Sequence, residues 1–328
     1  MFSYGSECES PSVKWSPAFV LFQTRYQVRA HASSRPLRPV VSIEFLGFAI
    51  LSVERALLVG YPQFHMVDIH CHLLFGLDDG PDTLETSIEM AEMAFADGIT
   101  HVVATPHSND RYTFIPELVQ KRRDEIQERF SGRLVFATGC DFHLSYENLK
   151  DIHLTPEKYT INQKSYLLVE FADFAIPPSS DQTLHELHLI GLKPIITHPE
   201  RNPLIRANPE RLYRWLRQGC YAQVTASSFL GRFGPSAKHM AEHLLQENCI
   251  HFIASDAHNL TSRPLKLSAA FDRVRELKGE EVAHALCRDN PLAAFEGRPL
   301  PFAPDPPEPA TSSKDAALPA RRKRFWFF

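Results

Sequence analysis

The sequence is 328 residues long, 44% hydrophobic and 23% charged, with a formal net charge of −4 at pH 7. These values are ordinary for a globular protein and exclude the strong positive field with which a protein attracts nucleic acid in general. The six cysteines are scattered without a Cys-x-x-Cys pair, which disfavours a thiolate zinc site and a disulfide scaffold and predicts a cytoplasmic location.

Residues 1–65 differ from the rest of the chain. They lack a clean hydrophobic period, and their apolar stretch from Val40 to Tyr61 carries charged residues, which argues against a membrane span. The segment Met66-Val-Asp-Ile-His70 that follows has the pattern of a first strand. We therefore expect the working protein to start near Met66, with residues 1–65 as a disordered or mis-started extension. A disordered regulatory arm is the alternative.

Between residue 66 and residue 300, short apolar runs alternate with amphipathic stretches. The expected strands are Val67–His70, His101–Thr105, Leu134–Thr138, Tyr166–Phe171, Pro194–Thr197, Tyr221–Thr225 and Ile250–Ala254. The expected helices are Thr83–Ala96, Pro116–Phe130, Asp181–Leu189, Asn208–Leu216 and Ser236–Gln246. This alternation predicts an α/β fold whose parallel sheet closes as a barrel, with about seven units instead of the usual eight.

The C-terminal residues 301–328 again differ in composition. A stretch rich in Pro, Ala and Asp predicts a linker, and the chain ends in Arg321-Arg-Lys-Arg-Phe-Trp-Phe-Phe328. Such a basic and aromatic tip is suited to touch an anionic membrane surface or a partner protein. A solvated tail without a role is the alternative.

A histidine or an acid stands at the carboxyl end of almost every expected strand. His70 and His72 are two residues apart, so their side chains face the same way and Cys71 points to the other side. The acidic turn at residues 76–80 follows them. The other strand ends supply His107, Asp141, His143, Glu170, His198, Glu200, Asp256 and His258. Any one of these residues could be a helix cap or a core residue, but in a parallel barrel all these ends lie on the face where active sites form.

The residue types at these ends indicate a metal centre. Imidazole and carboxylate without thiolate suit Mn, Fe, Zn or Co rather than structural zinc. About nine candidate ligands are too many for one ion and predict two or three, an arrangement that activates water and stabilises a leaving oxygen in phosphoryl transfer. Arg201 and Arg263 follow two of the strand ends and are placed to bind phosphate oxygens, with ordinary surface salt bridges as the alternative.

These motifs resemble those of the PHP (polymerase and histidinol phosphatase) superfamily, and within it the bacterial manganese-dependent protein-tyrosine phosphatases of capsule and exopolysaccharide operons. The matching segments are Asp68-Ile-His-Cys-His72, Leu77-Asp-Asp-Gly80, Ala104-Thr-Pro-His107, Leu168-Val-Glu-Phe171, Ile196-Thr-His-Pro-Glu-Arg201, Gln223-Val-Thr-Ala-Ser-Ser228 and Ile253-Ala-Ser-Asp-Ala-His-Asn-Leu260. The resemblance implies a distorted (β/α)7 barrel with a site for three metal ions, Mn²⁺ first among the candidates and Fe, Co or Zn as alternatives.

The same resemblance implies a set of ligands and a pair of phosphate-binding arginines. The implied ligands are His70, His72, Asp79, His107, Asp141, Glu170, His198, Asp256 and His258, with Arg201 and Arg263 holding the phosphate. One position departs from the family, where the third-strand ligand is usually Glu. Asp141 is shorter than Glu by one methylene, which puts its bridging role in doubt.

The expected function is therefore metal-dependent hydrolysis of phosphotyrosine by in-line attack of a metal-bridging hydroxide. The expected partner is a phosphotyrosine protein, such as a bacterial tyrosine kinase that controls capsule synthesis. The sequence is compatible with a homo-oligomer. None of the cysteines is followed six residues later by Arg, which excludes a cysteine phosphatase. The alternatives are a phosphatase for a small metabolite such as histidinol phosphate, a non-catalytic binding module and, with less support, a nuclease.

Overall fold

Parallel strands form the centre of the fold, in a computed structural model that describes residues 65–308. The strands are β1 (Met66–Cys71), β2 (Ile99–Ala104), β3 (His107–Ser108), β4 (Val135–Thr138), β5 (Asp141–His143), β6 (Tyr166–Glu170), β7 (Lys193–Thr197), β8 (Tyr221–Thr225) and β9 (Phe252–Ala254). They pair in the order β1-β2-β4 in one sheet and β3-β5-β6-β7-β8-β9 in the other, every pair parallel. Each strand expected from the sequence is present, with its ends shifted by no more than two residues.

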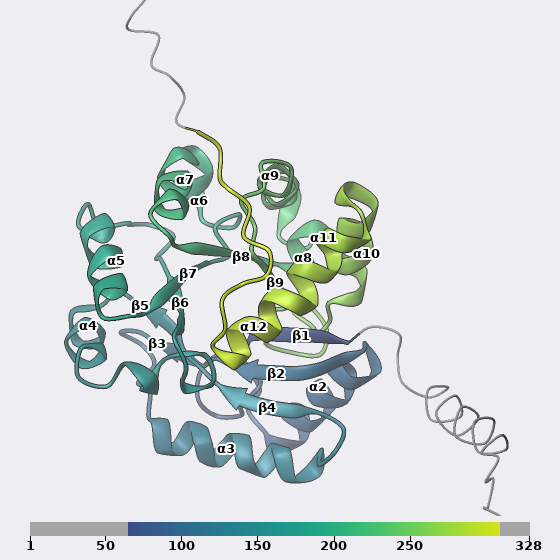
Figure 1. The fold of residues 1–328 in the computed structure, drawn as a ribbon. Coiled ribbons are helices and arrows are strands. Elements are labelled where there is room, and N and C mark those ends of the chain that lie inside the picture. Colours follow the sequence, from purple (N-terminus) through teal and green to yellow (C-terminus); the bar gives the residue numbers. More distant parts are fainter. Residues whose placement is uncertain (1–64, 309–328) are drawn as a thin grey trace, which may run out of the picture. The chain divides into compact units, whose positions relative to one another are not determined.

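The two sheets, of three and six strands, are parts of one distorted barrel (Figure 1). The β2 strand is interrupted at Thr105-Pro106 before β3, and β4 at Gly139-Cys140 before β5, so nine short strands occupy seven barrel positions. A bridge between Cys71 and Ala257 closes the ring, with hydrogen bonds of 2.8 Å from the His72 amide to the Ala257 carbonyl and from the Asp256 amide to the His70 carbonyl. The predicted barrel is confirmed.

Helices cover the outside of the barrel. They are α2 (Leu84–Ala96), α3 (Pro116–Arg129), α4 (Tyr146–Ile152), α5 (Ser180–Leu189), α6 (Pro203–Ala207), α7 (Glu210–Arg217), α8 (Ala226–Phe229), α9 (Gly234–Gln246), α10 (Ser268–Lys278), α11 (Glu280–His284) and α12 (Asn290–Glu296). The α2 helix shows why they form, because the Thr83 hydroxyl caps its first turn and Met90, Ala91 and Ala94 make its buried face. All five expected helices are confirmed; α4, α6, α8 and α10–α12 were not predicted.

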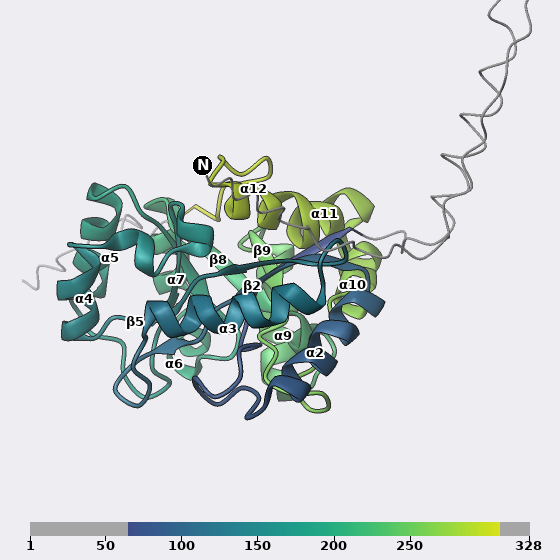
Figure 2. The ribbon, with the colours of Figure 1, turned by 90° about the horizontal axis from the view of Figure 1, so that it is seen from below.

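The α12 helix closes the amino-terminal end of the barrel. The barrel interior is filled by apolar side chains, and Ala294 of α12 packs against them; the strand residues of this cluster are Val67, Ile69, Val103, Ala137, Tyr166, Leu168, Ile195, Phe252 and Ala254. The Asn290 amide donates to the His251 carbonyl at 2.8 Å, just before β9. Figure 2 shows α12 on one side of the strands and the dark blue segment after β1 on the other. The carboxyl ends of the strands are thus left free to carry a site.

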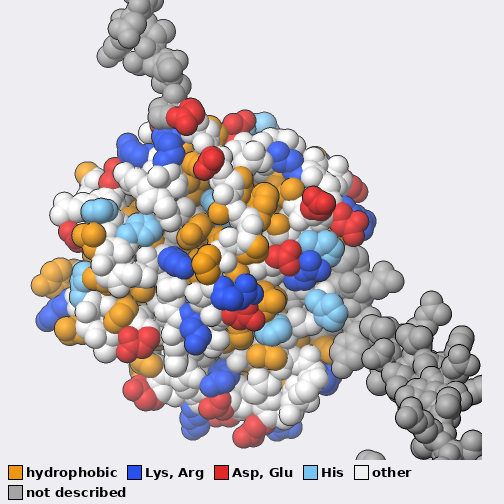
Figure 3. All heavy atoms as spheres, in the orientation of Figure 1, with side chains coloured by type: hydrophobic (Ala, Val, Ile, Leu, Met, Phe, Trp, Pro, Cys, Tyr) orange, Lys and Arg blue, Asp and Glu red, His pale blue; other side chains and the backbone are white. Residues whose placement is uncertain are grey.

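The face that carries α12 has an ordinary solvated surface. Over its described part, Lys and Arg side chains are interspersed with Asp and Glu side chains and with apolar ones (Figure 3). No helix among the described residues is long and apolar enough to cross a membrane. The candidate chemistry therefore has to be sought at the opposite end of the barrel.

Both terminal segments predicted from the sequence fall largely outside the described residues. These are residues 1–64 of the N-terminal extension and the basic-aromatic tip with most of the linker before it. Residues 301–308 are described and run along the barrel: the Phe302 amide donates to the Asn290 side chain at 3.0 Å, and the Pro307 carbonyl accepts from Arg217 at 2.6 Å. The first part of the predicted linker is thus bonded to the barrel domain.

Asp97 joins two helices that are far apart in the sequence. Its carboxylate accepts hydrogen bonds from the amides of Leu267 (2.7 Å) and Ser268 (2.9 Å), and from the Ser268 hydroxyl (2.6 Å), and so caps α10 from the end of α2. We expect Asp97→Ala to lower the free energy of unfolding by about 1–2 kcal/mol in urea denaturation, because these donors lose their acceptor. Asp173→Ala, which removes an exposed carboxylate, is the control, and equal effects of the two changes would contradict the capping role.

Candidate metal centre

The first strand delivers two histidines whose rings are held in fixed orientations. The His70 Nδ1–H donates to Gln223 Oε1 at 2.9 Å, and the His72 Nδ1–H donates to Asp78 Oδ2 at 2.6 Å. Both bonds leave the Nε2 atoms free to face the barrel mouth, and the ring centroids are 5.5 Å apart. Cys71 points the other way, into the outer core. The predicted convergence of His70 and His72 is confirmed.

The acidic turn after β1 folds back on His72. Gly80 is required there because a Cβ at this position would lie 2.3 Å from the His72 carbonyl oxygen. The turn brings Asp78 to His72 Nδ1 and Asp79 to His107 and His258. Asp78 also accepts from the amides of Gly80 (3.0 Å) and His107 (3.1 Å). Asp78 therefore orients the site, whereas Asp79, which is half-exposed, faces into it.

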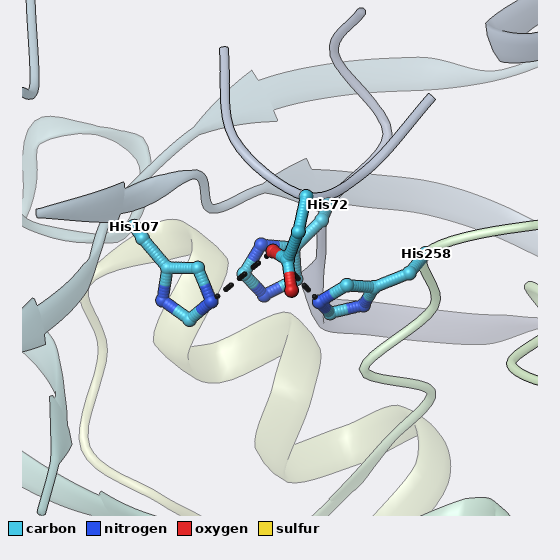
Figure 4. A group of neighbouring side chains, drawn as sticks. His72, His107 and His258 are labelled. Carbon is cyan, nitrogen blue, oxygen red and sulfur yellow. Dashed lines mark ion pairs between the residues drawn. The ribbon is translucent and has the colours of Figure 1, made fainter. Parts of the chain in front are cut away.

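Asp79 lies among three histidines that come from different strands. Its Oδ1 is 3.5 Å from His107 Nε2 and 3.3 Å from His258 Nε2. Figure 4 shows the rings of His72, His107 and His258 close together, with dashed lines for these two ion pairs. Ligand atoms of these four residues lie within 4.8 Å of one another, a spacing that would hold a metal ion.

Asp141 and Glu170 connect this group to the rest of the site. Three further groups have the same close spacing: His70, His72 and Asp141; His107, His143 and Glu170; and Asp141, Glu170 and His198. Four residues, His72, His107, Asp141 and Glu170, each belong to two of the four groups. Overlap of this kind fits two or three ions with shared ligands and suits one ion poorly.

His143 is the residue that the predicted ligand set left out. Its Nε2 makes a short contact with Glu170 Oε2, which is also 3.4 Å from His107 Nδ1. The signal was present in the sequence, because His143 follows Asp141 by two residues on one short strand, the same spacing as His70 and His72.

Several buried polar atoms of this site have no hydrogen-bond partner. They are the Nε2 atoms of His70, His72 and His258, Nδ1 of His107, and both carboxylate oxygens of Asp141. Buried polar atoms are almost always paired, since an unpaired one costs about 1–3 kcal/mol. Here the unpaired atoms are imidazole nitrogens and carboxylate oxygens that face one another. This donor set fits divalent metal ions, and both Asp141 oxygens face the site despite the shorter side chain.

Two candidate ligands sit in a strained backbone conformation. His198 has φ of 32° and Asp256 has φ of 50°, each directly or closely after a strand. Positive φ in a residue other than glycine costs about 1–3 kcal/mol and is concentrated at functional sites, where the surrounding structure enforces it. Here the positive φ angles direct the side chains of His198 and Asp256 into the barrel mouth.

The two predicted phosphate-binding arginines meet at Asp256. Arg201 and Arg263 both make short contacts with its Oδ2, while its Oδ1 lies 3.5 Å from His70 Nε2 and 3.4 Å from His72 Nε2. Asp256 thus links the arginines to two of the candidate metal-binding histidines. It belongs to none of the four closely spaced groups. Both guanidinium groups also lie over the Phe233 ring, at 4.3 Å and 5.9 Å from its centroid.

The electrostatics of the site favour bound cations. Burial alone lowers the pKa of His70, but the carboxylates of Asp141 and Asp256 raise it to about 9. Burial alone raises the pKa of Glu170, but His107 and His143 bring it down to about 2. The carboxylates are therefore ionised and attract positive charge. Bound metal ions would supply that charge in place of the protons on the imidazoles.

We expect Asp78→Asn to weaken metal binding although Asp78 itself faces away from the candidate ions. A carboxylate that orients a ligating histidine and raises its basicity typically contributes about 10–100-fold to metal affinity. Isothermal titration calorimetry of the metal-free protein with Mn²⁺ measures this loss of affinity. Asp82→Asn changes an exposed carboxylate on the same loop, and a loss in both variants would contradict a specific role for Asp78.

The barrel segment of the chain is similar to a known protein family. Residues 66–296 match the model of the family described as capsular polysaccharide synthesis, CpsB/CapC. The tyrosine-protein phosphatase YwqE of Bacillus subtilis (strain 168) is 34% identical over 267 residues, which cover 80% of this chain and 100% of YwqE. The tyrosine-protein phosphatase CpsB of Streptococcus pneumoniae is 30% identical over 237 residues, covering 69% and 96% of the two chains.

A solved structure gives the same relation in three dimensions. It comes from crystal structures of YwqE from Bacillus subtilis and CpsB from Streptococcus pneumoniae, described there as metal-dependent tyrosine phosphatases. It is similar to this chain with a TM-score of 0.69 and 33% identity, covering 74% of this chain and 98% of the other. The likeness thus extends over nearly the whole of the solved chain.

Proposed function

We propose that this chain, which belongs to the CpsB/CapC family of capsular polysaccharide synthesis, is a metal-dependent tyrosine phosphatase. The observation that carries the proposal is the cluster of unpaired imidazole and carboxylate atoms at the carboxyl end of the barrel. A protein that only bound a partner would have no use for so many buried imidazole and carboxylate atoms without hydrogen-bond partners. The family assignment supplies the substrate class, and the cluster supplies the means of hydrolysis.

The residues proposed to hold metal are those predicted from the sequence, with His143 added to them. They are His70, His72, Asp79, His107, Asp141, His143, Glu170, His198, Asp256 and His258. Mn²⁺ is the proposed ion, in two or three copies. Bound to these residues, such ions would supply an activated water molecule and stabilise the oxygen that leaves phosphorus.

The protein's own side chains have separate tasks in the proposed reaction. Gln223 and Asp78 fix the rings of His70 and His72, so that no reorientation is needed during the reaction. Arg201 and Arg263 neutralise the equatorial phosphoryl oxygens, and Asp256 holds both guanidinium groups at the metal edge. The tyrosine phenolate leaves with modest assistance, because its conjugate acid has a pKa of about 10.

The proposed mechanism uses no cysteine nucleophile. The described cysteines Cys71, Cys140, Cys220, Cys249 and Cys287 are all buried, and burial raises the pKa of Cys71 and Cys140 well above that of a free thiol. We expect thiol alkylation of the folded protein to leave most activity intact and EDTA to lower it at least about a hundredfold, with recovery on adding Mn²⁺. Hydrolysis of a phosphotyrosine peptide measures both, and the opposite pattern would contradict the proposal.

The proposed natural substrate is a phosphotyrosine protein, and more narrowly a bacterial tyrosine kinase that acts in capsule synthesis. Parallel assays of a phosphotyrosine peptide and of histidinol phosphate, each with and without Mn²⁺, test the substrate class. Mn²⁺-dependent release from the peptide supports the proposal. Release from histidinol phosphate alone would replace it with a metabolite phosphatase.

A further inference from the structure

A groove of about 400 Å³ lies beside the candidate metal centre and is lined by residues of the three segments that follow β3, β5 and β6. His143 and Glu170 line its inner end, and both also belong to one of the closely spaced metal-binding groups. The exposed lining is mainly apolar, and its volume falls within the range of about 300–1,000 Å³ that is usual for ligand sites. The groove is therefore continuous with the place where the proposed function puts the phosphoryl group.

The first loop follows β6 and presents an aromatic side chain to solvent. Phe174 is 87% exposed, more than any other large apolar side chain among the described residues. The loop that carries it is anchored on both sides. Asn202 donates to the carbonyls of Phe171 (3.3 Å) and Ala172 (3.2 Å), and the Ser180 hydroxyl donates to the Pro177 carbonyl at 2.7 Å. Phe174 is thus held outward on a pinned loop.

The wall at the base of this loop is rigid. Phe171 is buried and stacks on Trp215, with ring centroids 4.9 Å apart and planes inclined by 17°. The facing loop is fixed by Asn109, whose side chain accepts from the amides of Arg111 and Tyr112, both at 2.9 Å. A groove with fixed walls binds without a large ordering cost.

We propose that this groove binds the segment of the substrate around the phosphotyrosine, with the tyrosine ring at the inner end and an apolar neighbouring side chain on Phe174. The inference rests on the proposed phosphatase function. Glu170 belongs both to the candidate metal centre and to the lining of the groove. A phosphoryl group bound beside Glu170 would therefore direct the attached tyrosine ring into the groove. Asp110 and Arg111 belong to the lining, but its exposed area is mainly apolar, and an aliphatic side chain therefore matches the part around Phe174.

Two phosphotyrosine peptides that differ in their neighbours test the proposal. One has leucine on both sides of the phosphotyrosine and the other has glycine, and the measured quantity is the ratio of their kcat/KM values. We expect a ratio of about tenfold in favour of leucine for the wild type and a ratio close to one for Phe174→Ala, because the apolar contact is lost. Phe174→Leu keeps apolar area and should retain part of the preference.

Leu189→Ala is the matched control, since Leu189 is 72% exposed at the end of α5, outside the groove. It should keep the wild-type ratio. A Phe174→Ala variant with the wild-type ratio, or a wild type without preference, would overturn the groove alone. Hydrolysis of free phosphotyrosine by the wild type is measured first, and its absence would overturn the phosphatase function together with the groove.

Discussion

The Asp141→Asn variant is expected to lose at least about a thousandfold in kcat/KM on a phosphotyrosine peptide. Asp141 is fully buried, its two carboxylate oxygens have no hydrogen-bond partner, and it belongs to two of the four closely spaced groups. Asparagine has nearly the same shape but offers one neutral oxygen and an amide that repels a cation. The change therefore removes a shared ligand without opening a cavity.

Metal content separates this cause from misfolding. Elemental analysis of the variant after equilibration with Mn²⁺ should show fewer ions per chain than the wild type, with an unchanged far-ultraviolet circular dichroism spectrum. Asp272→Asn alters a carboxylate that is 51% exposed on α10 and serves as the matched control. Full metal content together with wild-type activity in Asp141→Asn would remove Asp141 from the ligand set.

The strand ends were predictable because two simple rules meet there. Side chains alternate along a strand, and parallel strands of a barrel end on one face, so His70, His72, His107 and Glu170 could be brought together without coordinates. The shortened Asp141 was the doubtful member, and β5 places it at the centre of the cluster. The rules say which edge a residue occupies but not which residues bind metal: the choice of ligands came from the family resemblance, and it left out His143.

The groups that orient the ligands were beyond those rules. Gln223 reaches His70 from 153 positions away in the sequence, across a barrel whose closure alone brings β8 near β1. Asp78 and Asp79 are neighbours of the same type. Only the turn at Gly80 decides which of them accepts the hydrogen bond from His72 Nδ1.

The C-terminal helices were missed for a different reason. Residues 268–296 contain no strand, so they lie outside the alternation by which the other helices were recognised. The buried residues of the two shortest of these helices are small or polar, namely Ala283 in α11 and Asn290, Pro291, Ala293 and Ala294 in α12. A face of this kind carries a weak hydrophobic period, although α12 closes an entire end of the barrel.

Replacing Arg263 with lysine is expected to lower kcat/KM about a hundredfold while leaving the bound metal in place. The removal of one donor to a developing oxyanion typically costs about 10²–10³ in rate. Lysine keeps the charge but cannot contact Asp256 and a phosphate oxygen with a rigid planar fork. Arg263 is placed for that task by Asn259, whose side chain accepts from the Arg263 amide at 3.1 Å and closes the loop after β9.

The alternative role of Arg263 is to position Asp256, and the metal content decides between the two. If the guanidinium serves mainly to hold Asp256 Oδ2, the lysine variant should lose Mn²⁺ affinity and activity in parallel, because Asp256 Oδ1 approaches His70 and His72. If it binds phosphate, competitive inhibition by inorganic phosphate should weaken while the Mn²⁺ titration stays unchanged. Arg275→Lys, on the outer helix α10, is the matched control.

Arg201 contacts the same Asp256 oxygen as Arg263. The effects of Arg201→Lys and Arg263→Lys on kcat/KM should therefore not add in the double variant, because the first change already disrupts the shared contact.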